Sequence, residues 1–188
     1  MLLADGPIQV LINNAGIHDD ALLPAMDAAR WRRVIEVSLN GFYNVTQPLL
    51  LPMIRTRWGR IVSVSSVAAV AGNAGQVNYA AAKAGLHGAT RALAREVASR
   101  GITVNVVAPG VIATPENAEL FPKERLEAMV PMKRAGTAEE RAWHLAVLAL
   151  AGRARDRAWL LGAVATLPGE PLRTQPKSEI GPLHLYHV

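Results

Sequence analysis

The sequence predicts an α/β protein in which helices cover a mainly parallel sheet. Three apolar runs rich in β-branched residues alternate with long segments of helical character, and polar or glycine-containing turns separate them. This alternation is typical of parallel strands joined by right-handed crossovers. With 188 residues, 51% of them hydrophobic and 19% charged, the chain is long enough to bury a core.

The N-terminal part supplies the first strand and the first long helix. We expect the strand over Ile8–Asn13, an apolar run that ends in Asn-Asn-Ala-Gly. The helix should have Asp27 as its cap and continue to about Arg57, because apolar residues recur there at near-helical spacing. Two prolines, Pro48 and Pro52, should kink or interrupt its later turns.

The middle of the chain repeats the alternation of strand and helix. A second strand is expected over residues 59–66, and Asn78 should cap a helix over residues 79–99 that stops before Gly101. A third strand begins at Ile102, and a Pro-Gly turn terminates it.

The C-terminal part is expected to add one helix and one strand. The helix should span Thr137–Ala151 and the strand residues 159–167, so that residues 1–169 form one domain. The tail, residues 170–188, contains three prolines and no clear period. We expect it to be irregular, although residues 183–188 have the composition of an edge strand.

Composition excludes several classes of protein. The absence of cysteine excludes a disulfide scaffold and a thiolate metal site, and it suits the reducing cytoplasm, where we expect the protein to lie. We expect no signal peptide, because the N-terminus lacks a basic region followed by a long apolar run. We expect no membrane span either, because basic residues interrupt the later apolar segments. The net charge of +5 suits nucleic-acid binding, but scattered arginines favour a basic surface with at most a local patch for an acidic partner.

Three side chains have a spacing that suggests acid–base chemistry. Tyr79 and Lys83 lie four residues apart in the predicted helix, hence on one face and near its positive N-terminus. Both the ammonium group and the helix dipole favour phenolate, so we expect the pKa of Tyr79 to lie below its ordinary value of about 10. Such a tyrosine can serve as a general acid or base, and Ser66 can bond the same substrate oxygen.

Other polar groups should gather at the same edge of the sheet. Asn14, Ser66 and residues 109–114 all follow predicted strands, and ligand sites of parallel α/β sheets form at the carboxyl ends of strands. Each pattern alone is common, since Tyr-x-x-x-Lys occurs by chance and a serine after a strand usually caps a turn. Together, and in this order, they indicate one binding site.

This combination of motifs resembles the short-chain dehydrogenase/reductase family. The matching pieces are Asn-Asn-Ala-Gly (13–16), Ser-Ser ending at Ser66, Tyr-Ala-Ala-Ala-Lys (79–83) and Ala-Pro-Gly-Val-Ile-Ala-Thr (108–114). The run from Gly75 to Gly110 is most similar to the 3-oxoacyl-[acyl-carrier-protein] reductases of that family. The resemblance implies a Rossmann-like, three-layer α/β/α fold.

The resemblance also implies a role for each of these residues. Tyr79 would protonate the substrate carbonyl oxygen, Ser66 would hold and polarise that oxygen, and Lys83 would bind the nicotinamide ribose and lower the pKa of the tyrosine. The cofactor would be NADPH, with NADH not excluded. The residues implied at the cofactor are Asn14, Tyr79, Lys83, Ile112 and Thr114.

The implied reaction is the reduction of a 3-oxoacyl thioester, linked to acyl carrier protein, to the 3-hydroxyacyl form in fatty-acid or polyketide-like synthesis. Similar proteins form dimers or tetramers through the helices that correspond to residues 27–57 and 78–99. Arg57 and Arg100 match positions at which similar reductases present basic side chains to the carrier protein. Two solvated arginines without such a role explain the same residues equally well.

Three features depart from the family pattern. Ser38 stands where the family usually has the asparagine that anchors a water in a proton relay through the lysine. The sequence contains no Gly-rich TGxxxGxG turn for the cofactor pyrophosphate, and it starts at what would be the fourth strand. The last predicted strand leads into Leu-Pro-Gly-Glu-Pro, where the family usually has an Asp/Asn-Gly-Gly turn.

The missing turn leaves a second interpretation open. One edge of the first strand should be uncovered, which implies that another chain covers it, that the fold is marginally stable, or that the sequence is part of a longer gene product. The alternative to an enzyme is therefore a non-catalytic family remnant that acts as a partner subunit. Nucleic-acid binding is the least favoured function.

Overall fold

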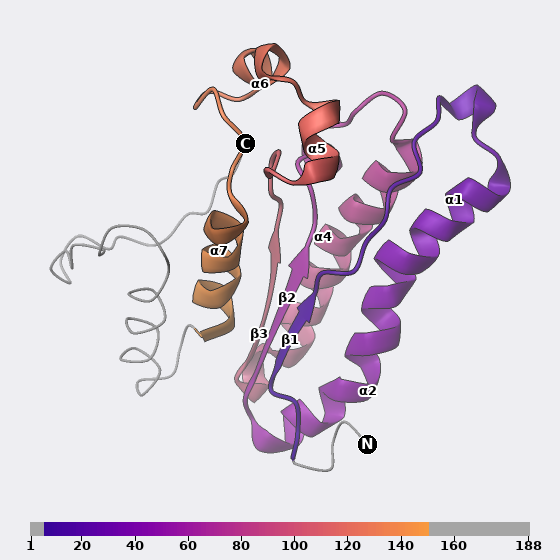
Figure 1. Cartoon of the computed structure of the whole chain (residues 1–188). Helices are drawn as coiled ribbons and strands as arrows, with labels where there is room; N and C mark the ends of the chain where they lie inside the picture. The colour runs from indigo at the N-terminus through magenta and orange to yellow at the C-terminus, as the bar shows by residue number, and fades with distance from the viewer. Residues whose placement is uncertain (1–5, 151–188) are drawn as a thin grey trace, which may run out of the picture. The chain divides into compact units, whose positions relative to one another are not determined.

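The computed structural model describes residues 6–150, and the chain divides after Gly110 into two compact units. The first unit contains a parallel sheet with its helices, and the described part of the second unit is mainly helical (Figure 1). The α/β class that the sequence predicts is therefore confirmed. The predicted strand at residues 159–167, the domain end at residue 169 and the tail at residues 170–188 lie outside the described residues.

The sheet contains three parallel strands in their sequence order. They are β1 (Val10–Asn13), β2 (Gly59–Val64) and β3 (Ile102–Val107), and β2 lies between the other two. Because the strands follow one another across the sheet in sequence order, right-handed crossovers place both connecting helical segments on the same face of the sheet. The strand predictions from the sequence are confirmed, with ends that differ by a few residues.

The first crossover is one long helical segment with a π-helical section. It begins with η1 (Leu23–Ala25) and continues through α1 (Ala28–Ile35), η2 (Glu36–Asn40) and α2 (Gly41–Thr56). As predicted, Asp27 caps α1, and its carboxylate accepts the N–H of Arg30 at 2.8 Å.

The prediction that prolines interrupt this helix is wrong. Pro48 and Pro52 lie inside α2, which continues through both to Thr56. Each proline removes one helical hydrogen bond, but α2 packs on β1 and β2 and buries Met53 completely, so tertiary packing stabilises the helix. The irregularity lies earlier, in the π-helical η2.

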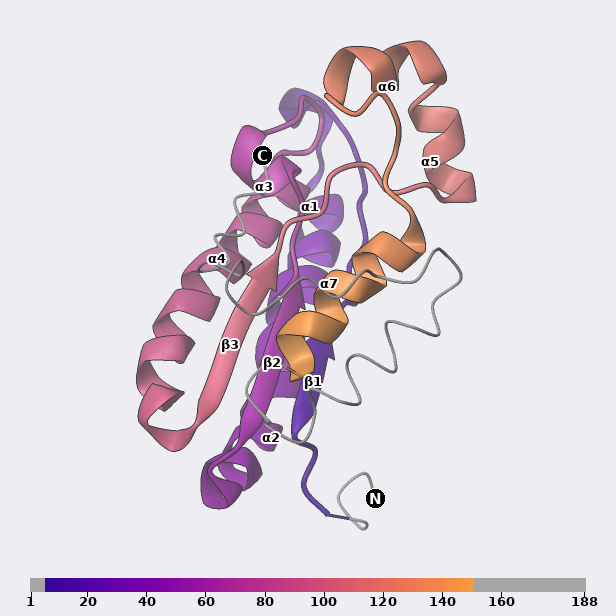
Figure 2. The same cartoon turned by 90° about the vertical axis from the view of Figure 1, so that its left-hand side faces the viewer.

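The second crossover contains the longest helix of the first unit. After α3 (Ala68–Ala71), α4 (Val77–Val97) runs beside β3 and ends in η3 (Ala98–Arg100) (Figure 2). Gly101 follows with a φ of 71°, the left-handed conformation that terminates helices, as the sequence predicts.

The prediction for Asn78 is wrong in its detail. The cap position of α4 is Gln76, and Asn78 lies in the first turn of the helix. Asn78 is completely buried, and its amide donates to the carbonyl of Asp19 at 3.0 Å. A tertiary contact therefore takes the side chain that the sequence assigned to a local cap.

The core of the first unit lies between the sheet and its helices. Its buried members come from all three strands and from α2 and α4; they are Leu11, Met53, Ile61, Val97, Ile102 and Val104. Burial of each of these side chains contributes about 1.5–3 kcal/mol relative to exposure. Its strand members lie in the amino-terminal halves of β1, β2 and β3, and Val97 is the last residue of α4, so this core holds the C-terminal end of α4 against the sheet.

The described part of the second unit contains α5 (Pro115–Leu120), α6 (Lys123–Met129) and α7 (Ala138–Leu150). Helix α7 begins one residue after the start of the predicted helix over Thr137–Ala151, and Ala151 lies outside the described residues. Helices α5 and α6 fall where the sequence predicts only a loop. An isolated bridge joins Ile112 to Gly136 within this unit.

Candidate active site

The tyrosine and lysine lie on one face of α4, as their spacing predicts. Lys83 Nζ is 5.7 Å from the centroid of the Tyr79 ring, within the range of a cation–π contact. Ser66 follows the end of β2, and its hydroxyl lies near enough to the Tyr79 phenol to lower the pKa of that phenol. Ser66 Oγ also accepts the N–H of Ala68 at 3.2 Å. The structure therefore groups the three side chains that the sequence predicts to be catalytic.

Lys83 is a buried ammonium group, with only 3% of its surface exposed. Its Nζ donates to the carbonyl of Val64 at 2.8 Å, at the carboxyl end of β2. Gly16 lies against it, because a Cβ at Gly16 would be 2.7 Å from Nζ and 3.5 Å from Ser38 Oγ. We call Gly16, Ser38, Val64 and Lys83 the lysine cluster. Since a buried charge must be hydrogen-bonded, this close packing restricts where the ammonium group can lie.

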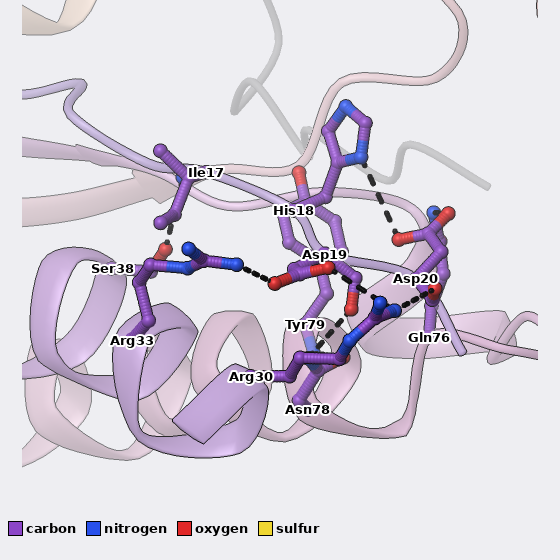
Figure 3. Close-up of polar contacts among 10 residues, drawn as sticks. All are labelled: Ile17, His18, Asp19, Asp20, Arg30, Arg33, Ser38, Gln76, Asn78 and Tyr79. Carbon is purple, nitrogen blue, oxygen red and sulfur yellow. Dashed lines mark hydrogen bonds and ion pairs between the residues drawn. The ribbon is translucent and has the colours of Figure 1, made fainter. Parts of the chain in front are cut away.

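Ser38 is buried in the π-helical η2. Its Oγ accepts the N–H of Ile17 at 3.4 Å, which joins the helix to the segment after β1 (Figure 3). Asn40 is exposed and donates to Glu36 at 2.6 Å, so it takes no part in this contact, as its position in the sequence indicates. π-helical turns are frequent at functional sites, and here the turn carries Ser38 to the lysine cluster.

The segment His18–Asp20, which we call the acidic loop, lies between α1 and the start of α4 (Figure 3). The Asp19 carboxylate pairs with Arg33 and, at 3.5 Å, with Arg30. Its backbone carbonyl accepts from the buried amide of Asn78, whose Oδ1 in turn accepts the N–H of Tyr79 at 2.8 Å. A continuous set of contacts therefore connects α1 to the backbone of Tyr79.

The other two residues of the acidic loop lie closer to the phenol. The Asp20 carboxylate accepts from Gln76 Nε2 at 2.8 Å and lies 3.6 Å from His18 Nδ1. The His18 ring meets the Tyr79 ring edge to face, with centroids 6.4 Å apart. The environment of Tyr79 thus includes a carboxylate as well as an ammonium group.

The pKa of Tyr79 is raised above its ordinary value, mainly because the half-buried phenol is desolvated. The hydrogen bond with Ser66 lowers this pKa, and the negative charge of Asp20 raises it. The expectation that the pKa of Tyr79 lies below its ordinary value is therefore wrong, because burial outweighs the groups that favour phenolate. The phenol is protonated at neutral pH, as a proton donor must be.

The residues predicted at the cofactor fall in both units. Asn14 follows β1 directly and donates its N–H to Ile12 at 3.1 Å, at the same edge of the sheet as Ser66. Ile112 and Thr114 belong to the second unit, where Thr114 caps α5 by accepting the N–H of Asn117 at 3.2 Å. Their roles at a cofactor remain predictions.

The second unit contains a pocket of about 360 Å³ beside these two residues. Ile112, Thr114, Phe121 and Leu126 are among its lining side chains, and Lys133 also lines it. The lining is mainly apolar, but the cations Lys123, Lys133 and Arg134 also belong to it, so it suits an apolar ligand group that carries negative charge.

Arg57 follows the end of α2 and Arg100 is the last residue of η3, so both lie near the amino ends of β2 and β3, at the opposite end of the strands. Arg57 donates to the carbonyl of Ser99 at 3.1 Å, and a Cβ at Gly101 would be 2.5 Å from the Arg57 carbonyl oxygen. Both side chains are exposed. Because β2 is six residues long, this end is about 20 Å from the strand end that leads to Ser66. A docking role for the two arginines stays a prediction.

Sequence reasoning missed a partly buried Ser–His pair next to Lys83. Ser65 Oγ lies 2.7 Å from His87 Nε2 and 3.0 Å from the carbonyl oxygen of Lys83. The spacing offered a signal, since His87 follows Lys83 by four residues and therefore shares its face of the helix. The sequence offered no such signal for the acidic loop, because the residues that contact this loop are distant from it in the sequence.

Within residues 6–150 the structure shows neither a metal-binding group of side chains nor a helix that could cross a membrane. In that part of the chain no three His, Asp or Glu side chains gather as a metal ion would require. The helices described there are also too short or too polar to cross a bilayer.

Comparison with known proteins gives consistent matches. The profile of the short chain dehydrogenase family matches residues 3–125, which contain all three strands and α4. The 3-oxoacyl-[acyl-carrier-protein] reductase FabG of Pseudomonas aeruginosa is 50% identical over 142 residues, which cover 74% of this chain and 58% of the relative. FabG of Thermotoga maritima is 50% identical over 146 residues, with 77% and 59% covered.

A relative with a different name is similar to the same extent. Nodulation protein G of Azospirillum brasilense is 44% identical over 146 residues, which cover 77% of this chain and 59% of the relative. The chain thus spans about three fifths of the length of the curated relatives it matches.

Proposed function

Because the chain belongs to the short-chain dehydrogenase family, we propose that it carries the acid–base site of an NADPH-dependent reductase for 3-oxoacyl thioesters. The observation that carries this proposal is the grouping of Ser66, Tyr79 and Lys83 at the carboxyl end of β2. The similarity to 3-oxoacyl-[acyl-carrier-protein] reductases supports the choice of substrate.

Tyr79 acts as the proton donor in this proposal. Its raised pKa keeps the phenol protonated at neutral pH, and the hydrogen bond with Ser66 keeps the hydroxyl available as an acid. When the substrate carbonyl is reduced, its oxygen takes the phenolic proton and becomes the hydroxyl of the product. The Lys83 ammonium group stabilises the phenolate that remains until solvent returns a proton.

The residues present fit the nicotinamide half of a dinucleotide. Lys83 Nζ and the Tyr79 hydroxyl would supply donors for ribose hydroxyls, and Gly16 lets the segment after β1 lie directly against Lys83 Nζ, where a Cβ would be only 2.7 Å away. Asn14 follows β1 at the same end of the sheet, and the family resemblance alone suggests that Ile112 and Thr114 of the second unit meet the carboxamide. When bound, NADPH supplies the hydride that reduces the carbonyl carbon.

The proposal extends to partners and location. The substrate would be held on acyl carrier protein, an acidic partner that Arg57 and Arg100 would contact at the opposite end of the strands. The exposed apolar side chains of α2, such as Tyr43 and Leu51, would be covered by a second copy in a dimer or tetramer. We place the protein in the cytoplasm.

The test is reduction of a 3-oxoacyl thioester of coenzyme A, followed by the loss of NADPH absorbance. Tyr79→Phe should lower kcat by about 10²–10⁴-fold with little change in KM, because a positioned general acid contributes about that much. Tyr43→Phe removes an exposed hydroxyl from α2 and should leave the rate unchanged. A Tyr79→Phe variant that keeps most of the wild-type rate would contradict the assignment.

The second candidate is a non-catalytic partner subunit. One observation favours it: α2 exposes the apolar side chains of Tyr43, Val45 and Leu51. In that case fluorescence titration should detect no NADPH binding by the chain, and the chain should co-elute with a complete reductase of the same family. Micromolar NADPH binding by the chain alone would exclude this candidate.

A further inference from the structure

A Ser–His pair, in which Ser65 is buried and His87 is partly buried, lies directly beside Lys83 and has no part in the proposed reaction. Ser65 Oγ and His87 Nε2 are 2.7 Å apart, and Ser65 is only 3% exposed. A serine and a histidine at this distance are the usual components of a nucleophile and its base. The pair therefore requires an explanation of its own.

The hydrogen bonds give this pair a definite direction. A hydroxyl has one hydrogen, and Ser65 donates it to the carbonyl oxygen of Lys83 at 3.0 Å, because a carbonyl can only accept. His87 must then donate its Nε2–H to Ser65 Oγ, which leaves the lone pair of the neutral ring on Nδ1. A base with no lone pair directed at the hydroxyl cannot activate it, so the pair is not a nucleophilic site.

The direction of the hydrogen bond from His87 to Ser65 does not depend on the charge of His87. Burial lowers the pKa of His87, and the neighbouring Arg91 lowers it further, so the neutral ring is favoured at neutral pH. A protonated ring also carries a hydrogen on Nε2 and would donate in the same way.

We propose that Ser65 and His87 are positioning residues that hold the Lys83 turn of α4 against the carboxyl end of β2. Lys83 is bound twice to this strand end: its side chain donates to the Val64 carbonyl, and its own carbonyl accepts from Ser65. Two contacts with consecutive residues fix both the backbone and the ammonium group of the lysine. The consequence for catalysis depends on the proposed function of Lys83, but the hydrogen-bond arrangement does not.

The chain provides matched controls for both members of the pair. Ser63 lies two residues before Ser65, is equally buried, and its hydroxyl has no hydrogen-bond partner among the residues described. Thr90 lies one turn beyond His87, and within the same part of the chain its buried hydroxyl also lacks a partner. Ser63→Ala and Thr90→Val therefore remove a buried hydroxyl without removing the proposed contact.

The first measurement is the tautomer of His87 in the ¹⁵N-labelled full chain, by long-range ¹H–¹⁵N correlation at neutral pH. The expected result is Nε2–H, with an Nε2 shift that changes in Ser65→Ala and stays the same in Ser63→Ala. His87→Gln assigns the signals. An Nδ1–H tautomer would overturn the proposal, because Ser65 would then donate to the ring as a nucleophile does.

The second measurement is hydrogen exchange of the Lys83 side-chain ammonium group, assigned with Lys83→Met. Ser65→Ala and His87→Leu should accelerate it roughly tenfold, the factor that corresponds to one lost hydrogen bond. His87→Gln keeps an Nε2 donor and should restore slow exchange, as should both control variants. Equal exchange in Ser65→Ala and Ser63→Ala would overturn the positioning role. Neither measurement needs turnover, so a failed reductase assay leaves both results interpretable.

Discussion

The lysine cluster and the acidic loop both adjoin Tyr79, but they are built from different interactions. In the lysine cluster a 3%-exposed ammonium group meets a backbone carbonyl and the surface of a glycine. In the acidic loop carboxylates meet Arg30 and Arg33, whose side chains are 43% and 62% exposed. Buried contacts resist salt and water, whereas exposed ion pairs are screened. We therefore expect the lysine cluster to fix the position of the Lys83 ammonium group and the acidic loop to adjust the electrostatic environment of Tyr79.

The largest effect is expected from Gly16→Ala in the lysine cluster. The new Cβ would lie 2.7 Å from Lys83 Nζ, so the bonded ammonium group must move. Urea denaturation should show a loss of about 1–3 kcal/mol in the free energy of unfolding, as overpacking usually causes. The control is Gly88→Ala in α4, where no atom lies within 4 Å and alanine should stabilise the helix by about 0.5–1 kcal/mol. A neutral Gly16→Ala would show that Lys83 is loosely held.

Asn78 connects the acidic loop to Tyr79 and should have the next largest effect. It is completely buried, and its amide joins the Asp19 carbonyl to the N–H of Tyr79. Asn78→Ala should lower the free energy of unfolding by about 1–3 kcal/mol, because both partners lose a buried hydrogen bond. Asn73→Ala, at an exposed position before α4, should change it by less than about 0.5 kcal/mol. Similar losses in both variants would remove the connecting role of Asn78.

A smaller, salt-dependent effect is expected from Asp19→Asn. The substitution removes the charge opposite Arg30 and Arg33 but keeps the backbone carbonyl that Asn78 uses. The loss of unfolding free energy should be below about 1 kcal/mol at low salt and should disappear near 1 M salt, where the Debye length is about 3 Å. A loss that persists at high salt would mean that the acidic loop behaves like the buried lysine cluster.

The smallest effect is a pH dependence that comes from His87. Because burial and Arg91 lower its pKa in the folded chain, the unfolded chain binds the proton more readily. The stability that depends on neutral His87 is complete above the unfolded pKa of about 6.5 and is lost as the pH falls below it. Denaturation at a series of pH values should show a flatter acid side for His87→Gln. Identical curves for the wild type and the variant would contradict a lowered pKa.

Local patterns were enough to predict much of the fold. The three strands, the Asp27 cap and the stop at Gly101 each depend on residues close together in the sequence. The uninterrupted helix at Pro48 and Pro52 could not be predicted in this way, because packing on β1 and β2 stabilises it. Asn78 was misassigned for the same reason, since its partner Asp19 is 59 residues away.

The candidate site shows a similar division. The proximity of Ser66, Tyr79 and Lys83 follows from their order along strand ends and a helix, while their catalytic roles stay a prediction. The direction of the pKa shift of Tyr79 did not follow, because burial and the charge of Asp20 arise only when distant segments meet. Sequence spacing therefore predicted which side chains lie close together, and the fold decides which effect on the pKa of Tyr79 is larger.

The most direct test of this arrangement is the titration of Tyr79 itself, by NMR of the full chain labelled with ¹³C at tyrosine Cζ. Tyr79→Phe assigns the signal. The expected midpoint lies above the ordinary value of 10.0 and rises further in Ser66→Ala, because the hydrogen bond that lowers the pKa is lost. A midpoint at or below 10.0, or one that Ser66→Ala leaves unchanged, would contradict a buried phenol held as a proton donor by Ser66.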